Sequence, residues 1–558
     1  MKVKSTGRFF VSSAGISNAR AGGLKLKVRG PAASLAALAI IIMMASAAIA
    51  QVASARGTGA ETVVRAKENP GRNSLYSDGK KALRSGKYEK AAKIFREIIS
   101  SDSLDLQAHI GLAYAYFKDQ SYQLCFNHSQ EAIKIDPNNA RAYALSGVAM
   151  LRSGYLEQAV QALVRANKLD SKEALAFGGA AEIDYYEGRA KEARSKAIQA
   201  YSLDPSEADY LMTLGRAASR LEMFTEAADA YERFLLVAPR TDNERRDRIK
   251  GLIQFYRQLV GVDVHQLTGL SFADVPFLLG SDRRPYVRVR VNGREATFVV
   301  DTGSGFTVIS KDAAKRFGVT PLARGGTSQG VGGDGTFDIV YGLINSIQLG
   351  EVKVKSIPCF IRPLHGTEDH AVEERADGFI GLSVLAHFLT ELDYKEKVMK
   401  LDRRPEKVAQ YRPAPEATVI PFRTTQNGLI SIETELDGSH HINAILDSGA
   451  SSSVISAAAV ERLNLQSSII RGQTARVVGA AGVTDNVEML YIRNCRVADI
   501  QQNNMRALIL DFDAINETSG FEQSGILGGD FLRNYRVTID FTRGQVIFTP
   551  HSAAVIKQ

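Results

Sequence analysis

The distribution of apolar residues along the chain changes near residue 270. Before this point, apolar side chains recur every three or four positions among many alanines, which is typical of amphipathic helices. After it, β-branched residues alternate with polar residues and glycine turns become frequent, which is typical of strands. Within the segment 286–301, Asn292-Gly293 interrupts the alternation and predicts a β-hairpin with a two-residue turn. The pattern therefore predicts an α-helical first half followed by an all-β second half.

The helical half repeats itself about every 34 residues between positions 72 and 241. Each unit has two positions occupied by small residues, and three of the units are followed by proline. The first series is Gly79, Ala113, Gly147, Ala181 and Gly215, the second is Ala91, Cys125, Ala159, Ala193 and Ala227, and the prolines are Pro137, Pro205 and Pro239. Small side chains at fixed positions let two helices pack closely, and proline ends the second helix of a unit.

This repeat resembles the tetratricopeptide repeat, in which pairs of antiparallel helices stack into an α-solenoid. The resemblance implies five repeats over residues 72–241 and a concave groove that binds a peptide or a protein partner. The segment 242–262 has helical periodicity and a charged face. We therefore expect a capping helix at the end of the array.

The β half contains two copies of one acidic turn. Residues 299–310 read VVDTGSGFTVIS and residues 445–456 read ILDSGASSSVIS, so each copy has two apolar residues before an Asp and a glycine two positions after it. A single Asp-Thr-Gly-Ser stretch is weak evidence, because an Asp at a β-turn is common. The second copy changes this interpretation, since it places two carboxylates in matching sequence frames.

Further landmarks follow both turns in the same order, first a glycine-rich stretch and then two apolar residues with a glycine. The interval from Asp301 to Gly381 equals the interval from Asp447 to Gly528 to within a single position. Landmarks that stay in register over so long a stretch indicate an internal duplication. We predict one β lobe over residues 271–405, a linker over residues 406–415 and a second lobe over residues 416–550.

This order of motifs resembles the retropepsin and pepsin-like aspartic proteases. The resemblance implies a bilobal all-β fold in which each lobe contributes one catalytic Asp, here Asp301 and Asp447. Two carboxylates close together cannot both ionise readily, so they share one proton. The charged carboxylate can then act as a general base toward water, and the neutral one as a general acid toward the carbonyl oxygen.

The remaining residues of the two turns have expected supporting roles. Thr302 and Ser448 are expected to hydrogen-bond across to the turn of the opposite lobe, and Ser304 to the carboxylate beside it. The supporting residues are thus Thr302, Gly303, Ser304, Ser448 and Gly449, and the predicted flap and substrate-binding residues are Val331, Gly332 and Gly333. The second turn has Ala450 where pepsins have a hydroxyl, for which we expect a less acidic pH optimum.

Three functional hypotheses follow. The first is an aspartic endopeptidase whose helical array recruits substrate or a partner. The second is a non-catalytic adaptor that keeps the fold and binds peptides with both halves. The third is an enzyme whose lobes pair between chains, and the duplication argues against it because one chain already supplies both lobes.

The charge of the chain is concentrated at its N-terminus. The formal net charge is +8, and the first fifty residues account for +7 of it without a single acid, so the remainder is nearly neutral. This distribution argues against a nucleic-acid partner. An uncharged run from Pro31 to Ala50 follows the basic residues, which is typical of an export signal. We expect residues 1–50 to be an export signal or a membrane anchor, residues 51–71 to be a linker, and the body to lie outside the cytoplasm.

No cofactor is expected, and the cysteines favour neither a disulfide framework nor a metal site. Cys125, Cys359 and Cys495 cannot all pair, so buried free thiols are the simplest interpretation. The stretch 365–370 contains His365, Glu368 and His370, which could ligate a metal, but a solvated loop between strands is the favoured interpretation. We therefore predict no metal site.

Overall fold

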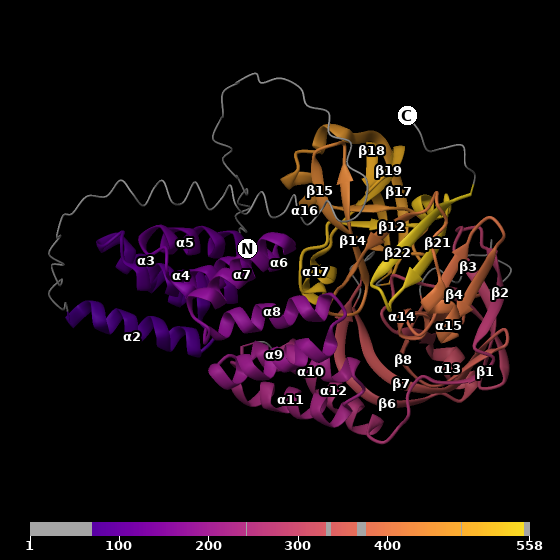
Figure 1. The fold of residues 1–558 in the computed structure, drawn as a ribbon, viewed down its shortest axis with the longest axis horizontal. Coiled ribbons are helices and arrows are strands. Elements are labelled where there is room, and N and C mark those ends of the chain that lie inside the picture. The colour runs from indigo at the N-terminus through magenta and orange to yellow at the C-terminus, as the bar shows by residue number, and fades with distance from the viewer. Residues whose placement is uncertain (1–69, 242, 331–335, 365–374, 481, 552–558) are drawn as a thin grey trace. The chain divides into compact units, whose positions relative to one another are not determined.

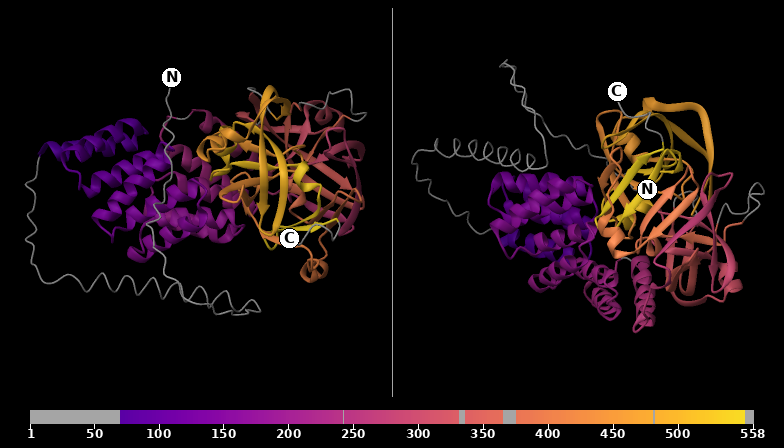
Figure 2. Two further views of the ribbon diagram at one scale, coloured as in Figure 1. Left: turned by 90° about the horizontal axis from the view of Figure 1, so that it is seen from above. Right: turned by 45° about the vertical axis from the view of Figure 1, so that its right-hand side comes forward.

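The computed structural model describes residues 70–241, 243–330, 336–364, 375–480 and 482–551 (Figure 1). Its first part is a series of antiparallel helix pairs. The helices are α2 (Pro70–Arg84), α3 (Tyr88–Ser101), α4 (Leu106–Lys118), α5 (Tyr122–Ile135), α6 (Ala140–Arg152), α7 (Leu156–Leu169), α8 (Ala174–Tyr186), α9 (Ala190–Leu203), α10 (Asp209–Arg220), α11 (Phe224–Val237) and α12 (Asn243–Leu259). The views in Figure 2 show these helices, in indigo to magenta, stacked next to one another along the array.

The small residues of the repeat lie where the two helices of a unit meet. A β-carbon built on Gly147 of α6 would lie 2.7 Å from Cγ of Leu163 on α7, and one on Gly215 of α10 would lie 2.7 Å from the ring of Tyr231 on α11. The second helices α3, α5, α7, α9 and α11 begin at equal intervals along the chain, with the period read from the sequence. The predicted tetratricopeptide array is therefore confirmed, with close helix packing as the reason for its small positions.

The strands form two lobes that repeat one arrangement. The first lobe contains β1 (Gln266–Gly269), β2 (Phe272–Leu279), β3 (Pro285–Val291), β4 (Arg294–Val300), β5 (Thr307–Ser310), α13 (Lys311–Phe317), β6 (Thr320–Gln329), β7 (Thr336–Leu349), β8 (Val352–Arg362), β9 (Gly378–Ile380), α14 (Leu382–Leu385), β10 (Leu389–Asp393) and β11 (Val398–Asp402). The second contains β12 (Thr418–Pro421), β13 (Arg423–Thr424), β14 (Ile430–Leu436), β15 (His440–Leu446), β16 (Val454–Ser456), α16 (Ala457–Arg462), η1 (Gln466–Ser468), β17 (Ile469–Gly479), β18 (Gly482–Val497), β19 (Ile500–Leu510), α17 (Asp513–Ser519), β20 (Gly525–Leu527), α18 (Gly529–Leu532), β21 (Tyr535–Asp540) and β22 (Gln545–Pro550).

Strand pairing in the two lobes follows the same rules. In the first lobe β4 runs parallel to β9, β9 antiparallel to β5, and β5 parallel to β8. In the second lobe β15, β20, β16 and β19 repeat these pairings in the same order. The hairpin turns also match, since Asn292 and Asp437 both have a φ of 51° and are each followed by a glycine with positive φ. The internal duplication read from the sequence is thus a duplication of topology.

A shared sheet joins the lobes. Its strand order is β12, β22, β21, β10, β11 and β2, so three strands come from each lobe. The junction is the antiparallel pair β10–β21, in which Leu392 lies opposite Val537. The predicted linker 406–415 includes most of a short helix, α15 (Pro405–Gln410), and leads into β12. One apolar core runs through both lobes and includes the fully buried rings of Phe298 and Phe531.

The end of the helical array packs on the first lobe. A β-carbon built on Gly251 of α12 would lie 2.1 Å from Cα of Gly325 on β6, so helix and strand touch through their backbones. One turn further along α12, the ring of Phe255 stacks on that of Tyr341 on β7, with centroids 4.6 Å apart. The capping helix predicted from the sequence therefore holds the base of the β6–β7 hairpin.

Cys125, Cys359 and Cys495 are all free and buried, which confirms the interpretation of structural thiols. Burial raises the pKa of each of these thiols. Among the helices that the structure describes, none has the length and apolar character needed to cross a bilayer. The predicted export signal or anchor (residues 1–50) and linker (residues 51–71) fall almost wholly outside the described residues, and α2 begins at Pro70.

Candidate active site

Each acidic turn lies at the end of a strand that is held on one side by a parallel neighbour. Asp301 follows β4 and its backbone N–H donates to the carbonyl of Ile380 at 3.0 Å. Asp447 follows β15 and its N–H donates to the carbonyl of Leu527, also at 3.0 Å. The strands that end in the apolar-apolar-glycine motif therefore fix the position at which each carboxylate leaves the sheet.

The two turns meet face to face. A β-carbon built on Gly303 would lie 2.2 Å from Cγ of Asp447, and one built on Gly449 would lie 2.6 Å from Cγ of Asp301. Each carboxylate thus lies over the glycine of the opposite turn, and any side chain there would displace it. The structure brings together two aspartates that are far apart in the sequence.

Backbone donors hold each carboxylate from its own turn. Oδ1 of Asp301 accepts from the N–H of Gly303 at 2.9 Å. Oδ1 of Asp447 accepts from the N–H groups of Gly449 at 2.8 Å and Ala450 at 3.1 Å. Ala450 has no side-chain hydroxyl, and at the second turn its backbone N–H donates to the carboxylate instead.

The hydroxyls of Thr302 and Ser448 connect the two lobes. Oγ1 of Thr302 donates to the carbonyl of Leu446 at 2.8 Å and accepts from the N–H of Ser448 at 2.9 Å. Oγ of Ser448 donates to the carbonyl of Val300 at 2.8 Å and accepts from the N–H of Thr302 at 3.0 Å. Both side chains are buried. These four reciprocal bonds confirm the expected cross-lobe contacts and fix the distance between the turns.

The environment favours a proton shared between the carboxyls. Burial raises the pKa of Asp301 well above its usual range, and the negative charge of Asp447 raises it further. Burial also raises the pKa of Asp447, while hydrogen bonds from Asp301, Gly449 and Ala450 oppose that rise. Because the two groups are coupled, their protons titrate as properties of the pair. The arrangement suits a pair of carboxyls that share one proton.

Two arginines that belong to no recognised motif act on this pair. The positive charge of Arg362 lowers the pKa of Asp301, and that of Arg284 lowers the pKa of Asp447. Arg362 ends β8, and its Nη1 donates to the carbonyl of Ala480 in the second lobe at 3.2 Å. The sequence signal that could have indicated Arg362 is its position as the lone arginine at the end of an apolar strand, residues 357–362.

One expected contact is wrong. Oγ of Ser304 donates to the carbonyl of Phe306 at 2.7 Å, because the chain folds back within the turn. Its hydroxyl therefore stabilises the turn, in place of the expected bond to the Asp301 carboxylate. The predicted flap residues Val331, Gly332 and Gly333 lie outside the described residues.

The described part of the chain contains no group of three or more His, Cys, Asp or Glu side chains that could hold a metal ion. His365, Glu368 and His370, the alternative metal ligands considered from the sequence, lie outside the described residues. The arrangement of the site is a pair of facing carboxyls.

Comparison with known families agrees with this geometry. The model of the aspartyl protease family matches the chain twice, over residues 287–384 and 432–531, once in each lobe. A tetratricopeptide repeat model matches residues 76–124 in the helical array. The second half of the chain is therefore similar to aspartyl proteases in both lobes, and the first half carries tetratricopeptide repeats.

Solved structures similar to the chain are proteins with helical repeats. The tetratricopeptide protein TTC0263 of Thermus thermophilus is 19% identical, and the match covers 34% of this chain and 100% of that protein, with a TM-score of 0.28. The protein MamA is 18% identical, with 30% of this chain and 90% of that one covered and a TM-score of 0.22. The Cut9–Hcn1 hetero-tetramer of the APC/C is 17% identical, with 34% and 41% covered and a TM-score of 0.29.

Proposed function

We propose that this chain, a tetratricopeptide array joined to a two-lobed domain similar to aspartyl proteases, is an exported aspartic endopeptidase. The observation that carries the proposal is the pair of carboxyls at Asp301 and Asp447, which face each other across the lobes. Facing carboxyls with raised pKa values are suited to general acid–base work without a metal or a covalent nucleophile. The double match to the aspartyl protease family supports the same assignment.

The two aspartates would divide the work according to their surroundings. Asp447 accepts two backbone N–H groups, which favour its charged form, so it is the better general base toward water. Asp301 accepts only one backbone N–H group, from Gly303, so its charged form is less stabilised and it would hold the shared proton as the general acid. Water then attacks the peptide carbonyl, its proton passes to Asp447, and the proton of Asp301 passes to the carbonyl oxygen. The proton on Asp447 then passes to the amide nitrogen and the C–N bond breaks, while a hydroxyl of the tetrahedral intermediate returns its proton to Asp301 and the carboxylic acid product forms.

The first half of the chain would serve this reaction in two ways. The basic and apolar character of residues 1–50 supports export, with the uncharged run either cleaved or kept as a membrane anchor. The helical array would recruit the substrate or a protein partner, since such arrays bind chains along an extended surface. N-terminal sequencing of the exported protein tests the first of these statements directly.

A peptide-cleavage assay tests the proposal. The wild-type chain, Asp301→Asn and Asp447→Asn are incubated with a mixed peptide library between pH 3 and pH 8. We expect cleavage by the wild type alone and inhibition by a statine-type compound. Cleavage that survives either substitution would contradict the shared-proton mechanism. Peptide binding without cleavage in the wild type would favour the adaptor hypothesis instead.

A further inference from the structure

A cavity of about 1820 Å³ lies between the helical array and the two lobes. One side of its wall is formed by the helices, with Arg152, Tyr186 and Arg216 among the residues that line it. The other side is formed by the lobes, with Phe306 and Gln426 among the lining residues. A cavity shared in this way can hold a ligand that contacts both parts at once.

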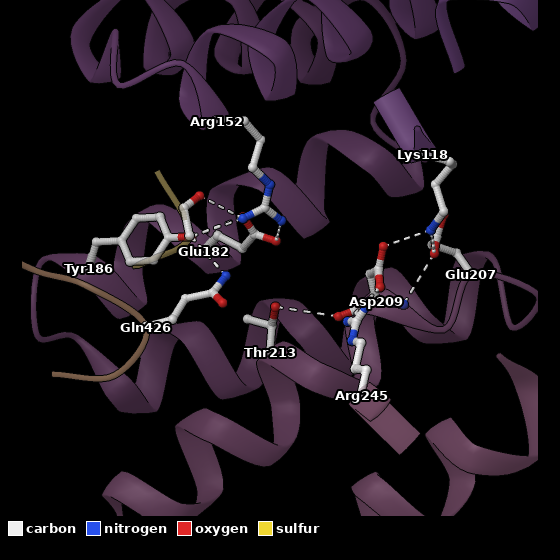
Figure 3. Close-up of polar contacts among 10 residues, drawn as sticks. Lys118, Arg152, Glu182, Tyr186, Glu207, Asp209, Thr213, Arg245 and Gln426 are labelled. Carbon is white, nitrogen blue, oxygen red and sulfur yellow. Dashed lines mark hydrogen bonds and ion pairs between the residues drawn. The ribbon is translucent and has the colours of Figure 1, made fainter. Parts of the chain in front are cut away.

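Hydrogen bonds join the array to the second lobe within the cavity wall. Nη1 of Arg152 donates to the carbonyl of Gly520 at 2.7 Å, and Nε2 of Gln426 donates to the hydroxyl of Tyr186 at 3.2 Å (Figure 3). Nη1 of Arg220 donates to Oγ1 of Thr424 at 3.1 Å. Together with the packing of α12 on β6, these bonds attach the array to both lobes. The residues of the lobes are therefore a fixed part of the cavity wall.

The cavity wall extends to the residues that follow the first acidic turn. Gly305 and Phe306 line the cavity, and Asn427 of the second lobe lines it next to them. A β-carbon built on Gly305 would lie 2.0 Å from the carbonyl oxygen of Asn427, so the two lobes touch at this point. The hydroxyl of Ser304, the last residue of the turn, donates a hydrogen bond to the carbonyl of Phe306. The wall of the cavity thus reaches the place where the two lobes touch, beside the first acidic turn.

Most positive charges in the wall are already matched by acids. Lys118 binds Glu207 at 2.8 Å and Asp209 at 2.6 Å, and Arg152 binds Glu182 at 2.6 Å (Figure 3). The remaining matched pairs are Arg141–Glu173, Arg245–Asp209, Arg248–Glu517 and Arg462–Glu522. These pairs are part of the protein's own structure and leave little net charge for a ligand.

Arg216 differs from these residues. No hydrogen bond or ion pair of its guanidinium occurs among the described residues, although the side chain is half-buried and lines the cavity. The phenol groups of Tyr231 and Tyr256 are close enough to Arg216 to respond to its charge. Burial raises the pKa of both phenols, and the positive charge of Arg216 opposes that rise. Arg220 lies one turn further along α10 and stacks on the ring of Tyr185 at 3.8 Å, without an acid as a partner among the described residues. The pair offers two positive charges with aromatic surface beside them.

We propose that the cavity binds an acidic segment of the peptide substrate, with a side-chain carboxylate on Arg216 and Arg220. The adjoining segment of the same peptide reaches the cleft between the lobes and is cleaved there. This proposal rests on the proposed protease function for the cleavage step only. The basic N-terminal fifty residues of the chain itself are a poor match for this site, because they carry seven positive charges and no acid. An extended acidic peptide matches both the charge and the aromatic surface.

Binding is measured first, apart from catalysis. The probes are two fluorescein-labelled, C-terminally amidated peptides that differ only in a central block, Glu-Tyr-Glu-Tyr in one and Gln-Tyr-Gln-Tyr in the other. The full chain carrying Asp301→Asn is used, so that cleavage does not consume the probe. We expect the acidic peptide to bind about tenfold more tightly, as one charge-assisted hydrogen-bonded contact provides. Equal affinities would overturn the proposal.

Substitution of the arginine shows where the preference arises. Adding Arg216→Gln is expected to remove the preference for the acidic peptide, and Arg216→Lys to keep part of it. The matched control is Arg233→Gln on α11, an exposed arginine that does not line the cavity. It is expected to keep the full preference. A preference that survives Arg216→Gln would contradict the proposed site, and a melting curve of each variant confirms that it is folded.

A linked substrate then tests the path to the cleft. The wild-type chain is given a cleavable peptide with the acidic block attached through a flexible linker, or the same two pieces as separate molecules. We expect KM to fall about tenfold or more only when the pieces are linked, because binding of the block then raises the local concentration of the cleavable segment. No difference between linked and separate pieces would overturn the path. If nothing is cleaved but the binding preference is found, the protease function fails and the acidic site stands.

Discussion

At the scale of single residues, the candidate site depends on the absence of side chains as much as on their presence. Gly303 and Gly449 each leave room for the carboxylate of the opposite turn, and Thr302 and Ser448 fasten the turns through buried hydroxyls. The two carboxyls are thereby held close together in a partly buried position, where burial raises the pKa of both and the charge of Asp447 raises that of Asp301 further. Two predictions follow from this electrostatic arrangement.

Arg362 should set the alkaline limit of activity. Its positive charge lowers the pKa of Asp301, so Arg362→Gln should make the shared proton harder to lose and move the alkaline limb of the pH–rate profile to higher pH. The measurement is kcat/KM for a peptide substrate between pH 3 and pH 9. Arg290→Gln, at an exposed arginine of β3, serves as the control and should leave the limb unchanged. A shift toward lower pH would show that Arg362 does not act through the charge of Asp301.

Asp301→Asn should stabilise the folded chain, and more so as pH rises. A carboxyl with a raised pKa binds its proton more tightly in the folded state than in the unfolded state, so folding stability falls as pH rises above the unfolded pKa of about 4. Asparagine removes this penalty. We expect the melting midpoint to rise by roughly 2–4 °C at pH 8, the effect of about 1 kcal/mol in a domain of this size, and to change little at pH 4.

Asp499→Asn, at an exposed turn of the second lobe, is the control for this measurement and should change the midpoint at neither pH. A midpoint that falls at pH 8 on Asp301→Asn would mean that the ionised carboxylate stabilises the fold, contrary to the direction of its pKa shift.

At the scale of secondary structure, local signals predicted the elements well. The Asn292-Gly293 and Asp437-Gly438 hairpins form where the residue types allow positive φ, and the helix pairs follow the period of the repeat. The signals did not reveal which elements pack together. Helix α12 was expected as a cap, and its contact with β6 depends on two glycines that no pattern connects, Gly251 and Gly325.

Gly251→Ala should destabilise the chain, although alanine is the better helix former. In an exposed helix this change stabilises by about 1 kcal/mol. Here the new β-carbon would meet the backbone of β6, and such overpacking typically costs about 1–3 kcal/mol. Thermal or denaturant unfolding gives the sign of the change. Gln254→Ala, at an exposed position of the same helix, should be nearly neutral. Stabilisation by Gly251→Ala would mean that α12 does not lie against β6.

At the scale of the whole molecule, one chain supplies both halves of the candidate site. The shared sheet pairs β10 of the first lobe with β21 of the second, and the cross-lobe hydroxyls join the turns within the same chain. A second copy is therefore not needed to bring two carboxyls together. This distinguishes the chain from an arrangement in which single lobes associate in pairs.

A mixing experiment tests this arrangement. Asp301→Asn and Asp447→Asn chains should each lose roughly 10²- to 10⁴-fold in activity, the usual contribution of a general acid or base. An equimolar mixture should be no more active than the two chains separately. Wild-type chain at the same total concentration is the reference. Recovery of activity on mixing would show that lobes from different chains form the site.

The helix pairs, the hairpins and the duplicated turns depend on contacts and conformations close in sequence, so residue types and spacing were enough to predict them. Asp301 and Asp447 were predicted as partners because the duplication repeats the landmarks around both. Other features could not be predicted in this way. They are the effects of Arg362 and Arg284 on the carboxyl pKa values, the hydrogen bond of the Ser304 hydroxyl, the packing of α12 on β6 and the absence of an acidic partner for Arg216 among the described residues. Each depends on the distance between atoms that only the folded chain brings together, and packing of the folded elements sets that distance.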